Sequence, residues 1–169
     1  MNYYLVDVEL MFSRNPFVQQ FQGQFSSIRP NFTEDVALES ALTGGTRAIA
    51  LPPALNNKNI LVEIVGGGVT KNQPYYSHSM AIQVIDTYGQ VRITEASTGK
   101  PIAAAYVKVY ARTDDGRVKF YKDGYTDIRG RFDYASLSTN DLDQASRFAI
   151  LVVSEQHGAA VREATPPQQ

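Results

Sequence analysis

The sequence predicts an all-β protein built from two small β-sandwich domains. Short runs of alternating polar and apolar residues are separated by Gly, Pro, Asn and Asp clusters, which is typical of strands joined by turns. The aromatic residues are 10 Tyr and 8 Phe without any Trp, and both types suit half-buried sheet surfaces. The chain of 169 residues is long enough for one or two compact domains.

The first half contains short strands around several turn clusters. A glycine pair at 44–45, the Pro52–Pro53 pair and three glycines at 66–68 each favour a chain reversal or the end of a strand. The expected strands are residues 3–11, 35–41, 46–51, 60–65 and 79–86. Residues 13–35 are expected to form a loop with about one helical turn, because Gly23 and a shortage of strong helix formers oppose a longer helix.

The second half has a more regular rhythm of strands and turns. The expected strands are residues 90–95, 105–112, 118–122, 131–134 and 148–154. The last of these is the most apolar and should be central in its sheet, and one short helix is expected near residues 138–146. We place a domain boundary at Thr87-Tyr88-Gly89, which predicts domains at 1–87 and 88–160 and a flexible tail at 161–169.

Four segments follow one another in an order that resembles a known family. They are Gly89-Gln-Val-Arg-Ile-Thr, Thr98-Gly-Lys-Pro-Ile, Ala104-Ala-Tyr-Val-Lys-Val-Tyr and Thr126-Asp-Ile-Arg-Gly-Arg-Phe. In this order they resemble carboxypeptidase-regulatory-like and collagen-adhesin B-type domains over about residues 88–156. That resemblance implies a transthyretin-like (prealbumin) sandwich, in which Gly130 would shape a tight turn and Phe132 would fill the core.

The first half has a weaker resemblance of a related kind. The Leu51-Pro-Pro segment, the strand at 59–65 and Tyr75-Tyr-Ser-His are similar to immunoglobulin-like, macroglobulin-type or fibronectin-like sandwiches of large bacterial exported proteins. This resemblance implies a scaffold or contact role without a reaction. It also implies a periplasmic or cell-surface location, with the export signal upstream, since the first residues lack a basic segment followed by an apolar run.

Composition excludes several classes of function. The net charge of −1 argues against a dedicated nucleic-acid binder. The absence of cysteine removes disulfides, thiolate zinc sites and a cysteine nucleophile. No run of about 18 apolar residues is present, so we expect no membrane span.

Catalytic and metal motifs are weak. The two histidines, His78 and His157, do not have the spacing of a zinc motif, and no serine-hydrolase elbow or phosphate loop occurs. Acidic turns leave calcium open as an alternative, since calcium takes several carboxylate and carbonyl ligands. The residues concerned are Asp114, Asp115, Asp123 and Asp127. We otherwise expect turn-forming aspartates, no cofactor and no enzymatic activity.

Aromatic and basic residues alternate around one predicted hairpin. Such a surface can hold a protein segment or a carbohydrate, although Tyr is also common on ordinary strand faces. The candidate interaction surface consists of Tyr106, Tyr110, Arg117, Lys119, Tyr121 and Tyr125. The sequence therefore predicts a non-catalytic interaction module whose partner is protein, either a second copy or another domain of a parent protein. The alternative is a carbohydrate- or calcium-binding accessory domain of a larger enzyme.

Overall fold

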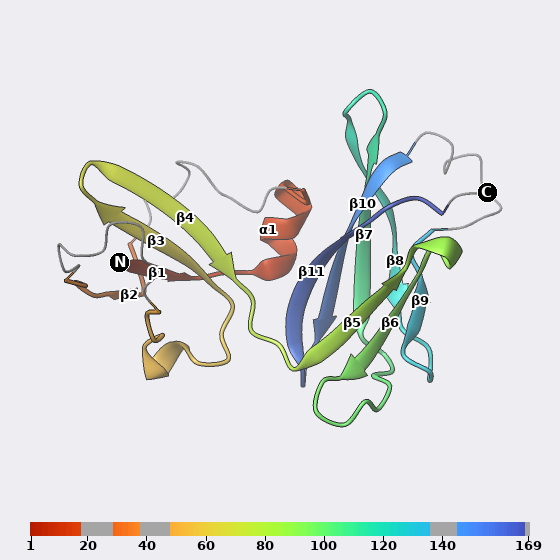
Figure 1. Ribbon diagram of the computed structural model, residues 1–169, viewed down its shortest axis with the longest axis horizontal. Coiled ribbons are helices and arrows are strands. Elements are labelled where there is room, and N and C mark those ends of the chain that lie inside the picture. The colour runs from red at the N-terminus through yellow and green to blue at the C-terminus, as the bar shows by residue number, and fades with distance from the viewer. Residues whose placement is uncertain (18–28, 38–47, 136–144, 168–169) are drawn as a thin grey trace. The chain divides into compact units, whose positions relative to one another are not determined.

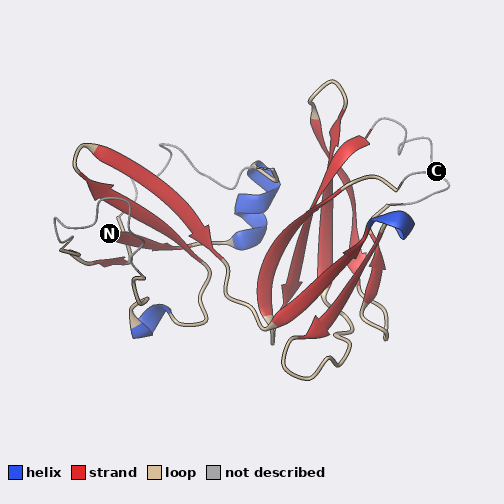
Figure 2. Ribbon diagram, viewed as in Figure 1, coloured by secondary structure: helices blue, strands red, loops and turns tan. Residues whose placement is uncertain are grey.

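A computed structural model describes residues 1–17, 29–37, 48–135 and 145–167, and it confirms the all-β fold class (Figures 1 and 2). Contacts between residues divide the chain into two compact units. The first unit comprises Met1–Asp7 and Val18–Ser77, and the second comprises Val8–Phe17 and His78–Gln169. A short segment near the N-terminus therefore belongs to the second unit, although residues on both sides of it belong to the first.

The first unit contains one antiparallel sheet in the order β2-β1-β3-β4. Its strands are β1 (Asn2–Leu5), β2 (Phe32–Thr33), β3 (Ile60–Gly66) and β4 (Val69–Tyr75), and a 3₁₀ turn covers Pro53–Leu55. Tyr3, Leu55 and Ile60 form its small buried core. The strand predicted at 60–65 is confirmed.

Strand β4 was not predicted, because its residues are mostly polar and include Pro74. It is an edge strand of the sheet, so Pro74, which has no backbone N–H to donate, has a neighbouring strand on only one side. The glycines at 66–68 do not simply end β3. Gly67 and Gly68 have φ of +58° and +78°, the left-handed values of a tight hairpin turn that returns the chain as β4.

Three strand predictions in the N-terminal region are wrong in the residues that the structure describes. The strand predicted at 3–11 ends at Leu5, and helix α1 (Val8–Arg14) follows, because the buried side chains have helical spacing. Residues 35–37 and 48–51 have no strand, and the rest of those two predictions lies outside the described residues. The sheet instead takes its edge strands from β2, within the predicted loop at 13–35, and from β4.

The second unit contains two antiparallel sheets (Figures 1 and 2). The four-stranded sheet has the order β11-β10-β7-β8, and the three-stranded sheet has the order β5-β6-β9. The strands are β5 (Met80–Ile85), β6 (Gln90–Glu95), β7 (Tyr106–Thr113), β8 (Val118–Tyr125), β9 (Arg131–Asp133), β10 (Ala145–Ser154) and β11 (Gly158–Ala164). Every strand predicted between 79 and 154 has a counterpart here, and β10 is central as expected.

The boundaries of the units differ from those that the sequence suggested. The second unit resumes at His78, so β5 belongs to it, and Asp86–Tyr88 is a 3₁₀ turn between β5 and β6. The segment 161–169 is not a tail throughout, because β11 continues to Ala164 and pairs with β10. The short helix predicted near 138–146 lies outside the described residues up to 144, and residues 145–146 begin β10.

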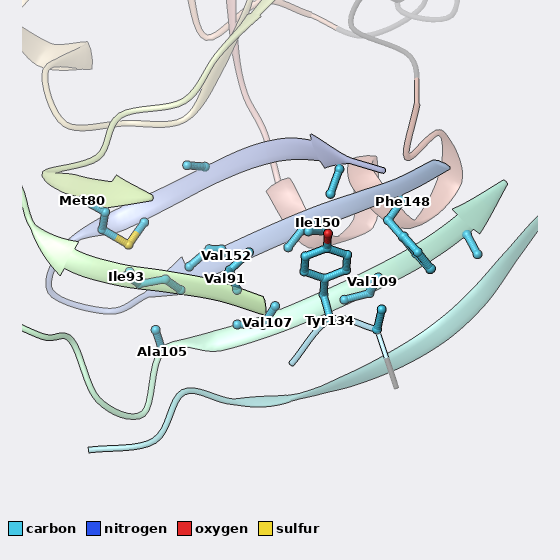
Figure 3. Packing of buried hydrophobic residues seen from close by; sticks show 14 of the residues in the cluster. Met80, Val91, Ile93, Ala105, Val107, Val109, Tyr134, Phe148, Ile150 and Val152 are labelled. Atoms are coloured by element: carbon cyan, nitrogen blue, oxygen red, sulfur yellow. The ribbon is translucent and has the colours of Figure 1, made fainter. Parts of the chain in front are cut away.

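Alternate residues of the strands in both sheets form the core of the second unit (Figure 3). Val107 and Val109 of β7 and Ile150 of β10 are fully buried. The Tyr134 hydroxyl is also buried in this core region, and it donates to Asp86 at 3.1 Å and to the carbonyl of Thr165 at 2.9 Å. A buried hydroxyl with acceptors avoids the penalty of an unsatisfied polar group.

The turn before β9 depends on Gly130, as the sequence predicts. Gly130 has φ of +70°, and a Cβ atom there would lie 2.3 Å from the carbonyl oxygen of Ile93. Asp127 accepts hydrogen bonds from the backbone N–H groups of Arg129 at 2.9 Å and Arg131 at 2.8 Å. The turn therefore brings β9 beside β6, where Phe132 packs against the core.

Candidate protein-interaction surface

The candidate surface lies on the outer face of the four-stranded sheet. In β7, Val107, Val109 and Ala111 point into the core, and the residues between them point outward. The outward residues are Tyr106, Lys108, Tyr110 and Arg112, all of which are half-buried. Their half-burial shows that other protein groups cover part of this face.

Strand β8 continues the same outer face, but a bulge changes its register. Tyr106 pairs with Tyr125, while the pairing shifts between Val109 and Tyr110, so that Tyr110 pairs with Phe120. Their rings lie 5.5 Å apart for Tyr106 and Tyr125, and 5.8 Å for Tyr110 and Phe120. Aromatic pairs across adjacent strands at such distances stabilise a sheet.

Tyr121 lies at the bulge and does not share this outer face. Its ring packs edge-to-face on Phe148 of the core, with 5.0 Å between the ring centroids. A bulge adds one residue to a strand and reverses the side on which the following residues point. For this reason Tyr121 supports the core, while Phe120 takes the outer position.

Helix α1 covers the part of the outer face that β7 contributes. Glu9 accepts a hydrogen bond from Lys108 at 2.7 Å, and the ring of Phe12 meets Tyr110 edge-on with 5.7 Å between centroids. The guanidinium of Arg112 lies 4.3 Å from the centroid of the Phe17 ring just beyond the helix. The buried residues of α1 are Val8, Met11 and Phe12.

An exposed apolar row remains along β8, beside the part that α1 covers. We call Val118, Phe120 and Tyr125 the β8 row; their exposed fractions are 45%, 50% and 67%. A groove of about 630 Å³ adjoins its Tyr125 end, and Tyr106 and Val153 line it together with the β10–β11 turn. Sequence reasoning missed Val118 and Phe120, which only the alternation within β8 together with the bulge could have identified.

Hydrogen bonds and charges fix the orientation of the groups around this row. Tyr106 donates its hydroxyl to Asp123 at 2.7 Å, and burial and this acceptor raise the pKa of Tyr106. The hydrogen bond to Glu9 raises the pKa of Lys108, so the lysine is charged at neutral pH. The outer face therefore carries one ion pair, between Glu9 and Lys108, and one hydrogen bond from a neutral tyrosine to a carboxylate among its aromatic rings.

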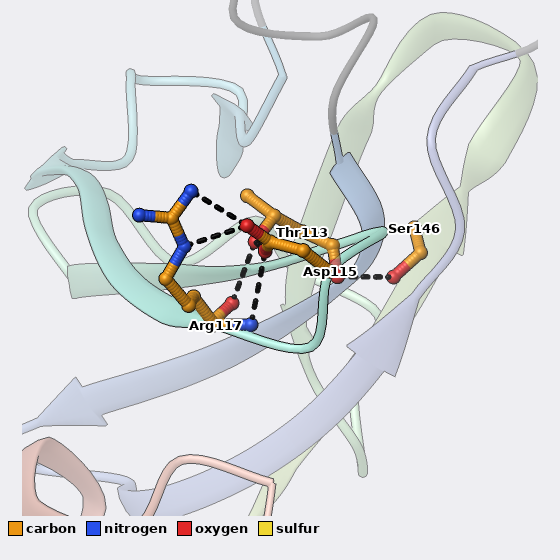
Figure 4. A network of polar contacts seen from close by, with 4 residues as sticks. All are labelled: Thr113, Asp115, Arg117 and Ser146. Atoms are coloured by element: carbon orange, nitrogen blue, oxygen red, sulfur yellow. Dashed lines mark hydrogen bonds and ion pairs between the residues drawn. The ribbon is translucent and has the colours of Figure 1, made fainter.

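The predicted residue Arg117 lies in the β7–β8 hairpin turn (Figure 4). Its guanidinium pairs with Asp115 at 2.6 Å, and the hydroxyl of Thr113 also donates to this carboxylate. These hydrogen bonds hold the pKa of Asp115 well below its usual range. Arg117 therefore stabilises the hairpin turn. Lys119 is half-buried and lies opposite Ala111 in the β7–β8 register.

The structure does not gather the acidic residues of the calcium alternative. Asp115 pairs with Arg117, Asp123 accepts from Tyr106, and Asp127 accepts from the backbone of its own turn. Across the described ranges, no group of three or more His, Asp or Glu residues is placed to hold a metal ion. Asp115 and Asp127 lie in turns, whereas Asp123 lies within β8, where it pairs with Lys108.

Comparison with known proteins gives the chain a family. The model of the AbpF C-terminal domain matches residues 79–169, and that of the AbpF seventh immunoglobulin-like domain matches residues 1–62. The chain belongs to the AbpF C-terminal domain family. It is also 39% identical over 167 residues to the protein named Actin-binding protein F of Dictyostelium discoideum, covering 99% of this chain and 7% of that relative.

These matches support part of what the sequence suggested. The immunoglobulin-like β-sandwich is supported, and so is an interaction module that belongs to a larger protein. The carboxypeptidase-regulatory-like assignment is not confirmed. The bacterial setting is unsupported, and the periplasmic or cell-surface location is wrong, because the relative is named Actin-binding protein F and comes from the eukaryote Dictyostelium discoideum. Among the described helices, none is long and apolar enough to cross a membrane.

Proposed function

We propose that this chain is a non-catalytic protein-interaction module of a larger actin-binding protein. The observation that carries the proposal is the 39% identity to Actin-binding protein F over 99% of the chain. Identity at this level along the whole chain, together with immunoglobulin-like domains, favours a shared architectural role. Because the chain spans only 7% of that relative, its own partner is a matter for experiment.

The geometry supports binding through the β8 row. Val118, Phe120 and Tyr125 form an exposed apolar strip on an edge strand, beside the Tyr106 hydroxyl and charged groups. Apolar patches with a polar rim are typical of protein contacts, and Tyr is among the residues that contribute most at interfaces. We assign protein as the partner class, and no contact in the described residues favours carbohydrate.

The topology of the second unit is compatible with a transthyretin-like arrangement, which we retain as part of this proposal. Strand β6 pairs with β9, while β7 lies between β8 and β10. This places the four segments of the resemblance in one sandwich. Its two sheets leave the outer face of β8 available for contacts, beside the part of β7 that α1 covers, which agrees with a scaffold role.

Co-sedimentation of the full chain with actin filaments tests the proposal. We expect the chain to pellet with the filaments, and Tyr125→Ala to weaken binding about tenfold or more, since truncating a central aromatic side chain at an interface costs on the order of 2 kcal/mol. Tyr88→Ala is the matched control, because Tyr88 is 68% exposed against 67% for Tyr125 and lies outside β8. Equal effects of the two substitutions would reject the β8 row, and a wild-type chain that stays in the supernatant would reject actin as the direct partner.

A further inference from the structure

Helix α1 is docked on the sheet of the second unit. Its residues belong to that unit by contacts, although the segments before and after it belong to the first. Its contacts with the sheet join residues far apart in the sequence, and Glu9 and Lys108 are 99 positions apart. The helix has only seven residues, and a helix of that length is not stable alone in water. Its folding therefore depends on the surface to which it binds.

The sheet face beneath α1 also needs an occupant. Ala149 and Leu151 of β10 pair with Tyr110 and Lys108 of β7, so they share the outer face, and both are fully buried. Without a cover, these side chains and the Tyr110 ring would form one exposed apolar surface. Such a surface next to the exposed β8 row would favour association with another molecule.

The recognition chemistry of the face can be read from α1. A carboxylate at Glu9 binds Lys108, and an aromatic ring three residues later, at Phe12, packs on Tyr110. Residues three apart lie on the same side of a helix, so both groups reach the sheet together. A helix of this pattern fits the face, and every copy of the chain carries one.

We propose that α1 can occupy the same face of a second copy, so that two chains associate by exchanging their helices. This inference rests on the proposed function, since it names a second copy as one partner of the module. Exchange can preserve the contacts of Glu9 with Lys108 and of Phe12 with Tyr110, and the first unit is exchanged together with the helix because the residues on both sides of α1 belong to it. The loss of translational freedom and the high effective concentration of the chain's own helix oppose the exchange. Self-association then depends on chain concentration.

Complementary charge reversal tests the exchange directly. Glu9→Lys places two cations together within one chain, and Lys108→Glu places two anions together, so α1 is repelled in each variant alone. When the two variants are refolded together, both ion pairs are restored, but only between chains. We expect the equimolar mixture to double the chain mass of 18.7 kDa in light scattering, while each variant alone does not. The double variant Glu9→Lys with Lys108→Glu restores the pair within one chain and should match the wild type.

A second readout covers the case in which a reversed charge prevents folding. The chain has no cysteine, so chains with Glu9→Cys mixed with chains with Lys108→Cys can be linked at these two positions by a short bis-maleimide, which adds to one thiol at each end, only between copies. Neither substitution removes a buried apolar side chain. A covalent dimer of the mixture, absent with the matched pair Tyr88→Cys and Lys108→Cys, is the expected result. A monomeric charge-reversed mixture without cross-linking overturns the exchange, while actin co-sedimentation remains an independent test of the proposed function.

Discussion

Replacing Phe12 with alanine tests whether α1 is bound to the second unit. The Phe12 side chain is only 3% exposed, and its ring meets Tyr110 edge-on. Removing a buried Phe ring costs about 3–5 kcal/mol, of which an edge-to-face pair contributes roughly 1 kcal/mol. Because α1 covers the sheet surface and is not part of the central core, we expect the lower limit, about 3 kcal/mol, as a loss in the free energy that holds the helix in place.

Hydrogen exchange of the backbone amides of α1, followed by mass spectrometry, measures this loss locally. A change of about 3 kcal/mol predicts amide exchange about a hundredfold faster in the helix wherever the amides exchange by undocking. Amides of β10 in the central core should change much less. Urea unfolding followed by circular dichroism should show a smaller loss, because undocking limits the effect on the rest of the unit.

Leu10→Ala is the matched control on the same helix. Leu10 is 52% exposed, so its truncation should cost below about 1 kcal/mol. Both substitutions introduce alanine, so the change in helix propensity is similar and small. If Phe12→Ala and Leu10→Ala accelerate amide hydrogen exchange in α1 equally, the docking of α1 through Phe12 is refuted. The proposed swap of helices between two chains then loses its structural basis.

Three further results are expected. Gly130 and Gly99 have left-handed φ values of +70° and +71°, so replacing either with alanine strains the backbone. Only Gly130→Ala also drives a Cβ atom into backbone atoms, so the melting temperature of this variant should fall clearly further than the few degrees expected for Gly99→Ala. Burial and the hydrogen bond to Glu34 raise the pKa of Tyr3 to about 12, so the stability that its protonated form contributes is complete below a pH of about 10 and is lost between there and pH 12. In alkaline unfolding, the wild type should lose more stability over this pH range than Tyr3→Phe does. The depressed pKa of Asp115 means that its contribution to hairpin stability disappears as the pH falls below the unfolded value of about 4, so Asp115→Asn should make the stability of the β7–β8 hairpin less dependent on acid pH. Amide exchange of the hairpin measured against pH would not differ between the wild type and Asp115→Asn if this is wrong.

Local patterns were sufficient to predict most of the second unit. The alternation of apolar residues defines β6 from Gln90 to Glu95 as predicted, and the apolar run at 148–153 identifies β10 as the central strand. Glycine and aspartate clusters mark the hairpin between β7 and β8. In these segments the propensity, the turn chemistry and the tertiary environment agree.

The same reasoning fails where two periodicities fit one segment. Between residues 5 and 11 the sequence alternates like a strand, but Val8, Met11 and Phe12 also have the spacing of a helical face. The choice is made by the sheet of the second unit, which supplies Lys108 and Tyr110 as partners for the helix. A pattern of seven residues carries no information about a surface about a hundred positions away.

The candidate surface combines these two difficulties. Strict alternation places Tyr121 beside Tyr125 on the outer face, but the bulge turns Tyr121 onto Phe148, while α1 covers Tyr110. The residues selected by type therefore separate into a supporting group and an open group. Substitution of Tyr110 or Tyr121 should lower stability, whereas substitution of Tyr125, which is 67% exposed, should alter binding with little change in the melting temperature. A Tyr125→Ala variant that lost stability as much as Tyr110→Ala would show that the outer face is one packed surface without a free side for a partner.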